Sequence, residues 1–316
     1  MDRCSLYSDR YSSTNSVASL SLTLLGTDLN GLRNMAKDLE ELESRMHDRW
    51  RHRQKQPYRG SAINWDWLYD SYEYRTWSSN TVDRVGNLLW LLDHDVVRMS
   101  LYLSSLVSTY SESCLPASSD DIVYFYYTAP PPELDVELNS NSLHLLDSRG
   151  HPSSPPLAAV LCVFIAQIIK SRGGYFQRLG PSDHAALMLA FQATRVVLQH
   201  KTNDGCSPDD LQQALAALED SEEILWSIFE GSVTAKRWRS LVVVLDGLNY
   251  APLDGLGRFL ERLSKLQEVV CKAEGSLRPV VSGQYSSGAS HKTFPGVLRL
   301  DRAAERAGTY MTLGPP

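Results

Sequence analysis

The segment from Leu88 to Ser100, LLWLLDHDVVRMS, has the frame of a phosphate-binding loop, in which an apolar strand leads into an eight-residue loop and a helix. A working loop has the pattern GxxxxGK followed by Ser or Thr. Its glycines let backbone amides surround the phosphates, its lysine adds a cation and its hydroxyl holds Mg²⁺. On this frame Asp93 and Arg98 occupy the glycine positions and Met99 occupies the lysine position. Only Ser100 is retained, so the sequence predicts a loop that keeps its place and loses its phosphate-binding residues.

The residue types inside this loop oppose an anionic ligand. Asp93 and Asp95 put two carboxylates where phosphates would lie. Like charges about 4 Å apart repel by roughly 1 kcal/mol in water and by several times more in a partly buried cleft. Val96 and Val97 are β-branched and resist the positive φ angles that a phosphate-cradling turn requires. Arg98 can offset one carboxylate, but it cannot rebuild the ring of amides.

A second segment, LVVVLDGLNY from Leu241 to Tyr250, predicts a buried strand that ends at an acidic residue. The β-branched run is apolar on both faces, as a central strand of a parallel sheet requires. Asp246 could hold Mg²⁺ through water. It could equally cap the next helix, because carboxylates favour N-cap positions whatever the function.

The elements around these two segments alternate between strand and helix. Strands are expected at 88–92, 122–127, 241–246, 278–282 and 297–301, and helices at 100–107, 157–170, 182–201, 211–229 and 256–270. Such alternation predicts a parallel sheet with helices on both faces, which is a three-layer α/β/α sandwich. Ser182 is expected to cap one helix, and SPDD at Ser207–Asp210 to open the next.

A long helix is expected to precede the sheet. Its apolar stripe recurs at steps of three and four residues, with acidic residues opposite, and consists of Leu32, Met35, Leu39, Leu42, Met46 and Trp50. Packing on the chain's own core is favoured over a partner-binding or coiled-coil role. The basic run at 49–59 has interleaved aromatic residues, but a solvated linker is favoured over single-stranded nucleic-acid binding. The alternative for this run is binding of a partner or of an acidic lipid.

Several of these segments resemble one family in their order and spacing, the fungal NACHT-like (nephrocystin-3 N-terminal-like) STAND P-loop NTPases. The matching segments are LNGLRN at 29–34, INWDWLYDSYEYRTW at 63–77, LLWLLDHDVVRMS at 88–100, IVYFYY at 122–127, VLDGLNY at 244–250 and RPVVSGQY at 278–285. The resemblance extends from about Leu29 to Asp301. It implies a P-loop NTPase-like fold with a mainly parallel five-stranded sheet, preceded by a helical N-terminal segment.

The resemblance also implies which positions would form the nucleotide site. The vestigial P-loop positions are Asp93, His94, Asp95, Val96, Val97, Arg98, Met99 and Ser100. Asp246 is Walker B-like, and Asn249 stands where the family has its second acidic residue. Gln284 replaces the arginine that would sense the γ-phosphate, which removes a cation that stabilises the transition state.

The domain organisation follows from these segments and from composition. A disordered polar tail is expected at 1–20, a helical preamble at 21–85, the degenerate NACHT-like domain at 86–305 and a C-terminal tail at 306–316. Residues 128–156 are rich in Pro and Ser and are expected to form an exposed insertion.

Composition excludes several other classes of protein. The net charge of −6 argues against a general nucleic-acid binder. The 5 cysteines form no CxxC pair, so neither a zinc site nor a disulfide framework is expected, and a reducing, cytoplasmic compartment fits best. His94 is flanked only by carboxylates and is expected to be solvated rather than to bind a metal. No secretory signal and no membrane-spanning segment are expected.

These observations predict a NACHT-like pseudo-NTPase, an interaction or regulatory module without efficient NTP hydrolysis. No cofactor is expected, and the partner is expected to be a protein rather than nucleic acid. The alternative is a residual signalling NTPase that binds ATP or GTP with Mg²⁺ through Arg98, Ser100 and Asp246.

Overall fold

The computed structural model describes residues 29–54, 66–79, 87–92, 100, 102–107, 120–127, 155–172, 174–201, 207–235, 240–248, 251, 255–283 and 296–301. The expected tails and most of the expected insertion lie outside these residues. Pro155, near the end of the insertion, is buried, and the carbonyl of Pro156 accepts a hydrogen bond from Ala159 at the start of the next helix.

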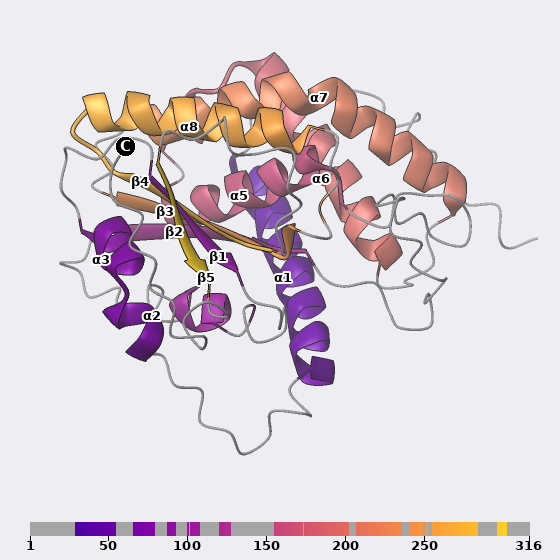
Figure 1. The fold of residues 1–316 in the computed structure, drawn as a ribbon. Helices are drawn as coiled ribbons and strands as arrows, with labels where there is room; N and C mark the ends of the chain where they lie inside the picture. Colours follow the sequence, from indigo (N-terminus) through magenta and orange to yellow (C-terminus); the bar gives the residue numbers. More distant parts are fainter. Residues whose placement is uncertain are drawn as a thin grey trace, which may run out of the picture.

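The structure is built on a parallel sheet, and this confirms the expected α/β class (Figure 1). The strands are β1 (Asn87–Leu92), β2 (Asp120–Tyr126), β3 (Ser240–Asp246), β4 (Leu277–Ser282) and β5 (Gly296–Asp301). They lie in the order β2-β3-β4-β1-β5, and every neighbouring pair is parallel. All residues of β3 are buried, as its β-branched, two-sided apolar sequence predicts.

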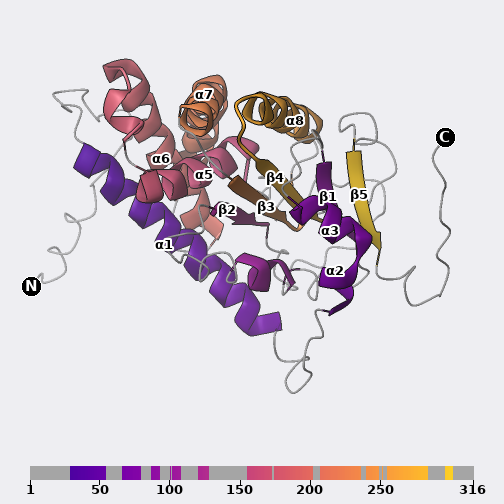
Figure 2. The ribbon, with the colours of Figure 1, turned by 90° about the vertical axis from the view of Figure 1, so that its left-hand side faces the viewer.

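Long helices cover the first face of this sheet (Figures 1 and 2). They are α1 (Leu29–Gln54), α5 (Leu157–Arg172), α6 (Pro181–Lys201), α7 (Pro208–Thr234) and α8 (Leu256–Lys272), with a short 3-10 turn, η4 (Phe176–Arg178), before α6. α5 is apolar all round because α1, α6, α7 and the sheet enclose it. α7 begins as predicted, since the Ser207 hydroxyl accepts a hydrogen bond from the Asp210 amide at 3.1 Å. α6 begins at Pro181, so Ser182 lies inside the first turn and the N-cap expectation was wrong.

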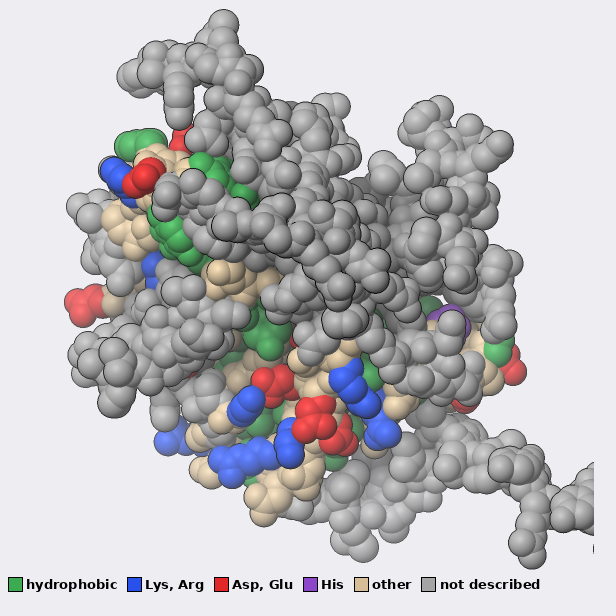
Figure 3. Space-filling model, turned by 90° about the horizontal axis from the view of Figure 1, so that it is seen from below, with side chains coloured by type: hydrophobic (Ala, Val, Ile, Leu, Met, Phe, Trp, Pro, Cys, Tyr) green, Lys and Arg blue, Asp and Glu red, His purple; other side chains and the backbone are tan. Residues whose placement is uncertain are grey.

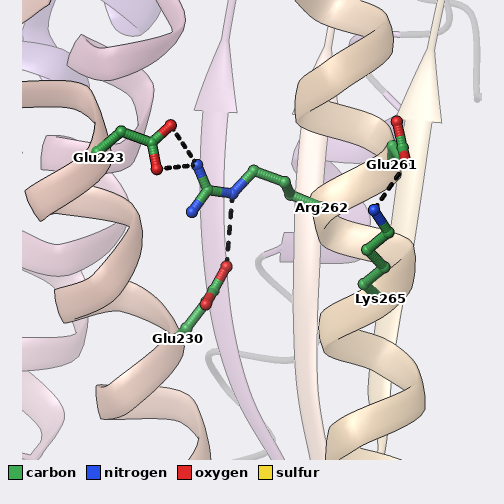
Figure 4. Close-up of polar contacts among 5 residues, drawn as sticks. All are labelled: Glu223, Glu230, Glu261, Arg262 and Lys265. Atoms are coloured by element: carbon green, nitrogen blue, oxygen red, sulfur yellow. Dashed lines mark hydrogen bonds and ion pairs between the residues drawn. The ribbon is translucent and has the colours of Figure 1, made fainter.

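Arg262 of α8 makes polar contacts with α7 (Figure 4). The Arg262 guanidinium donates to both carboxylate oxygens of Glu223 at 2.8 Å, and its Nε lies 3.6 Å from Glu230. The same guanidinium lies over the ring of Trp226, 4.7 Å from the centroid. Arg262 therefore combines ion pairing and cation–π contact at the helix interface.

Short helices cover the second face. They are α2 (Asp66–Asp70), α3 (Tyr72–Ser78) and a helix at residues 102–107. Leu68 and Trp77 from the first two pack with Tyr102, Leu103 and Leu106 of the third against β1, β3 and β4. The helices of the expected preamble thus contribute to the same cores as the sheet, because α1 packs on α5 in the first core and α2 and α3 belong to the second.

The stripe of α1 packs on the chain's own core, as predicted. Leu32, Leu39 and Leu42 are buried, and Met35 and Met46 pack against the same core. Two expectations were wrong. Glu43 is buried rather than placed on an outer acidic face, and the basic run expected to be a linker is helical as far as Gln54.

The outer edge of β2 pairs with a side chain. The amide of Gln167 in α5 accepts from the Tyr124 backbone N–H at 2.8 Å and donates to the Tyr124 carbonyl at 3.0 Å. The glutamine therefore satisfies the two backbone groups that a further strand would use at this position.

Candidate functional site at the carboxyl end of the sheet

Three serine and aspartate side chains meet where β1, β3 and β4 end. Asp246 is the last residue of β3, Ser282 is the last residue of β4, and Ser100 lies on the segment that follows β1. In open parallel sheets ligands bind outside the carboxyl ends of the strands, where the strand order reverses. Here the chain leaves β1 for the far edge at β2 and returns through β3 and β4, so these ends are the expected place for a site.

Hydrogen bonds join the three side chains into one buried cluster. The hydroxyl groups of Ser282 and Ser100 both donate to the Asp246 carboxylate. The backbone N–H of Gly247 donates to Ser282 Oγ at 3.0 Å and also hydrogen-bonds to Asp246. Each of Ser100, Asp246 and Ser282 is only 1% exposed.

Burial dominates the protonation of Asp246. It raises the pKa of this carboxyl from 3.8 to about 6, because a buried negative charge loses its hydration. The hydrogen bonds from Ser100, Ser282 and Gly247 act in the opposite direction, since they favour the charged form. These hydrogen bonds do not outweigh the loss of hydration, so the pKa of Asp246 remains raised.

The turn after Asp246 requires a glycine. Gly247 has φ of +74°, which side chains rarely allow, and a Cβ at this position would lie 2.4 Å from the Tyr127 carbonyl oxygen. The Tyr127 amide in turn donates to the Asp246 carbonyl at 2.9 Å. The close approach of the chains after β2 and β3 therefore depends on the missing side chain.

A tyrosine and a glutamate extend this polar layer. Tyr126 pairs with Asp246 in the β2–β3 register, and burial raises its pKa well above 10, with smaller contributions from Glu43 and Asp246. Its hydroxyl hydrogen-bonds to Ser104, so the helix at 102–107 also reaches the site. Glu43, 2% exposed, brings α1 near this end of the sheet.

The structure brings together two of the residues predicted from the sequence, Ser100 and Asp246. Asp246 does not cap the next described helix, because the N-cap position of α8 is Gly255. The other predicted residues lie outside the described residues, namely Asp93, His94, Asp95, Val96, Val97, Arg98, Met99, Asn249 and Gln284.

Sequence reasoning missed four residues of this layer: Glu43, Ser104, Tyr126 and Ser282. The available signal was Ser282, a polar residue that follows the apolar residues of its strand as Asp246 does in β3. Glu43 and Ser104 both lie on helices, and a helical pattern does not predict which strand end a side chain approaches.

A nucleotide-bound Mg²⁺ needs oxygen ligands that are free to face the ion. Carboxylate and hydroxyl oxygens are ligands that Mg²⁺ accepts. In this structure, however, the hydroxyls of Ser100 and Ser282 point at Asp246, and all three residues are buried. They do not fit the ion unless these hydrogen bonds are first broken. Among the described residues, no group of three or more His, Cys, Asp or Glu side chains has a metal-binding arrangement.

Comparisons of the chain with protein-family models, with curated proteins and with solved structures found no match. What the fold and the site define is therefore an α/β protein with a parallel sheet and a buried Ser–Asp–Ser cluster at its carboxyl end. None of the described helices is long and apolar enough to cross a membrane.

Proposed function

We propose that this chain is a NACHT-like pseudo-NTPase, an interaction or regulatory module that retains a P-loop NTPase-like α/β/α fold without efficient NTP hydrolysis. The observation that carries the proposal is the contact between Ser100 and Asp246. In working P-loop NTPases a loop Ser or Thr and a Walker B Asp hold Mg²⁺ together. Here the same two residue types follow β1 and end β3, and they are hydrogen-bonded to each other.

The loss of catalysis is inferred from the residue types around this pair. Met99 cannot supply the lysine cation, Asn249 cannot act as the second acid, and Gln284 cannot sense a γ-phosphate as an arginine does. The Asp246 carboxylate is further engaged by Ser282, which the resemblance did not predict. A buried carboxylate that accepts these hydrogen bonds is better suited to joining strand ends than to holding a hydrated ion.

The first test is thermal unfolding of the full chain with and without millimolar ATP or GTP and Mg²⁺. A ligand that binds only the native state at a hundred times its Kd would add about 2.7 kcal/mol, which raises Tm by several degrees. We expect no shift for the natural chain. A nucleotide-dependent shift of that size would contradict the proposal.

A gain-of-binding variant makes a negative result informative. D93G/R98G/M99K restores both glycines and the lysine of the loop pattern on the same frame. If the frame is intact, this variant gains a nucleotide-dependent rise in Tm that the natural chain lacks. The same variant with Asp246→Asn added should lose part of this gain, because Asp246 stands where a working P-loop NTPase has the carboxylate that holds Mg²⁺.

The second candidate function is a residual STAND-type signalling NTPase that binds ATP or GTP with Mg²⁺ through an altered loop. The residue types of Ser100 and Asp246 favour it, because hydroxyl and carboxylate oxygens are ligands that Mg²⁺ accepts, and this function requires their mutual hydrogen bond to break. The two functions predict different results for thermal unfolding with nucleotide and Mg²⁺. Stabilisation of the natural chain by nucleotide, abolished by Asp246→Asn, would select the second.

The proposed partner is a protein, and the proposed setting is a cytoplasmic signalling or incompatibility-type pathway of the kind the fungal family serves. The net charge of −6 and the mixed charges on one face of the described residues support a protein partner over nucleic acid. Basic and acidic side chains of the described residues are interspersed on the face seen in Figure 3. Pairs such as Lys37–Glu41 and Lys170–Glu40 show the same mixing on and beside α1. Nucleic-acid binding depends instead on clustered positive charge.

A further inference from the structure

The two faces of the sheet are covered very differently. On the first face α1 has 26 residues, α5 has 16 and α7 has 27. On the second face α2 has 5 residues and α3 has 7. Isolated helices shorter than about 12–15 residues are marginal in water, so α2 and α3 depend on their attachment to the rest of the chain. Residues 66–79, which include both helices, are called the α2–α3 segment below.

Apolar side chains make one set of attachments. Leu68 is 1% exposed and Trp77 is 3% exposed, and both pack in the second core. The Trp77 indole N–H donates to the Pro279 carbonyl of β4 at 2.9 Å. Trp67 makes an edge contact with Tyr102, with 5.0 Å between ring centroids.

Arg278 makes the second set of attachments between the α2–α3 segment and the sheet. It is a buried residue of β4, and its Nη1 donates to the carbonyl of Ser78, the last residue of α3, at 3.2 Å. Its Nε and Nη2 donate to the Ser240 hydroxyl of β3 at 3.1 and 2.8 Å. The guanidinium also lies 5.4 Å from the centroid of the Trp77 ring. Arg278 thus joins the end of α3 to two strands.

The opposite side of the segment faces water. Tyr72 is 69% exposed, and the Arg75–Asp70 ion pair has both side chains more than half exposed. Exposed ion pairs of this kind contribute little to stability. Segments held by few buried contacts open at a lower free energy than the rest of a protein.

We propose that the α2–α3 segment is a latch that opens as one unit while the sheet and the long helices stay folded, and that Arg278 holds it closed. Opening uncovers an apolar strip on the second face that includes Leu89, Leu91 and Val280. The latch is a property of the chain itself. The latch proposal does not depend on the proposed pseudo-NTPase function, so a test that refutes one leaves the other unaffected.

Hydrogen exchange of the full chain, followed by mass spectrometry at several low urea concentrations, tests the latch in the natural protein. Amides of residues 72–78 should exchange at least a hundredfold faster than those of β3, with a smaller dependence on urea, because less surface is exposed in the opening. Equal protection and equal urea dependence for the two sets would overturn the proposal.

The variant R278M tests the role of the arginine, and R262M is its control. Arg262 also lies over a tryptophan ring, but on the first face between α7 and α8. R278M should accelerate exchange in residues 66–79 at least tenfold while α5 and α6, which cover the first face, keep their rates. R262M should not accelerate residues 66–79 selectively. Uniform acceleration throughout the chain in R278M would assign Arg278 to global stability and refute the latch.

Discussion

Ser282 and Asp246 are joined through their side chains across two neighbouring strands. The Ser282 hydroxyl donates to Oδ1 of Asp246 and accepts from the Gly247 amide at 3.0 Å. Since Ser282 ends β4 and Asp246 ends β3, this contact holds the two strand ends in register. It also engages an oxygen of the carboxylate that would hold Mg²⁺ if the chain bound a nucleotide.

Removing the Ser282 hydroxyl should destabilise the chain. Ser282→Ala deletes a buried hydrogen bond to a carboxylate and leaves the Gly247 amide without that acceptor, which should cost about 1–3 kcal/mol. Urea unfolding at pH 7.5 measures the loss. Ser227→Ala is the control, because Ser227 lies on the exposed face of α7 and the change should have an effect of less than about 0.5 kcal/mol. Equal effects of the two changes would show that the Ser282 contact contributes nothing.

Asp246 should make stability fall as the pH rises from about 4 to 6. Its pKa is about 6 in the folded chain against 3.8 as its ordinary value, so in this window the native state holds a proton that the unfolded state has released. The free energy of unfolding therefore decreases with pH and levels off above about 7, by roughly 3 kcal/mol in all. The measurement is the difference in unfolding free energy between the natural chain and Asp246→Asn at each pH, because asparagine does not titrate. A difference that stays flat or rises with pH would contradict the raised pKa.

Adding one methyl group at Gly247 should be severely destabilising. Gly247→Ala meets both a positive φ and a carbonyl oxygen 2.4 Å away, so we expect a loss of about 2–4 kcal/mol in urea unfolding. Gly257 is the matched control, since it lies in the first turn of α8 and a Cβ there meets nothing within 4 Å. Gly257→Ala should stabilise the chain by roughly 0.5–1 kcal/mol. The prediction fails if both variants change stability in the same direction.

Replacing Gln167 should expose the edge of β2. Gln167→Leu removes both hydrogen bonds to the Tyr124 backbone, which should lower stability by about 1–3 kcal/mol and increase self-association through the unpaired edge. Urea unfolding and light scattering measure the two effects. Gln212→Leu adds the same apolar side chain at an exposed position of α7 and is the control for hydrophobicity alone. Equal scattering by the two variants would argue against edge exposure.

The sequence was most informative where a pattern is local. The β-branched run before Asp246 predicted a buried strand, and the serine, proline and two aspartates at 207–210 predicted the start of α7, because each depends only on neighbouring residues. The stripe of α1 likewise predicted which side of the helix is buried. The start of α6 was misplaced because Pro181 is itself suited to a first helical turn.

The site was less predictable because it depends on strand order. Ser100 and Asp246 were found through the frame of a known motif, whereas Ser282 and Tyr126 join them only because β4 and β2 flank β3 in the sheet. Glu43 shows the same limit, since a helical pattern predicts that charged residues face water. Its burial follows from where α1 lies beside the strand ends, and that position has no local signal in the sequence.

β4 has one consequence for mutational studies of this chain. Side chains alternate along a strand, so Arg278, Val280 and Ser282 point to the same side of the sheet. Arg278 donates a hydrogen bond to the end of α3. Ser282, four residues further along the same strand, donates one to Asp246. The two residues are roughly 13 Å apart along the strand and hydrogen-bond to different partners. Their effects on stability should therefore add, and a double-mutant cycle with a clear deviation from additivity would show that β4 carries coupling between α3 and the strand ends.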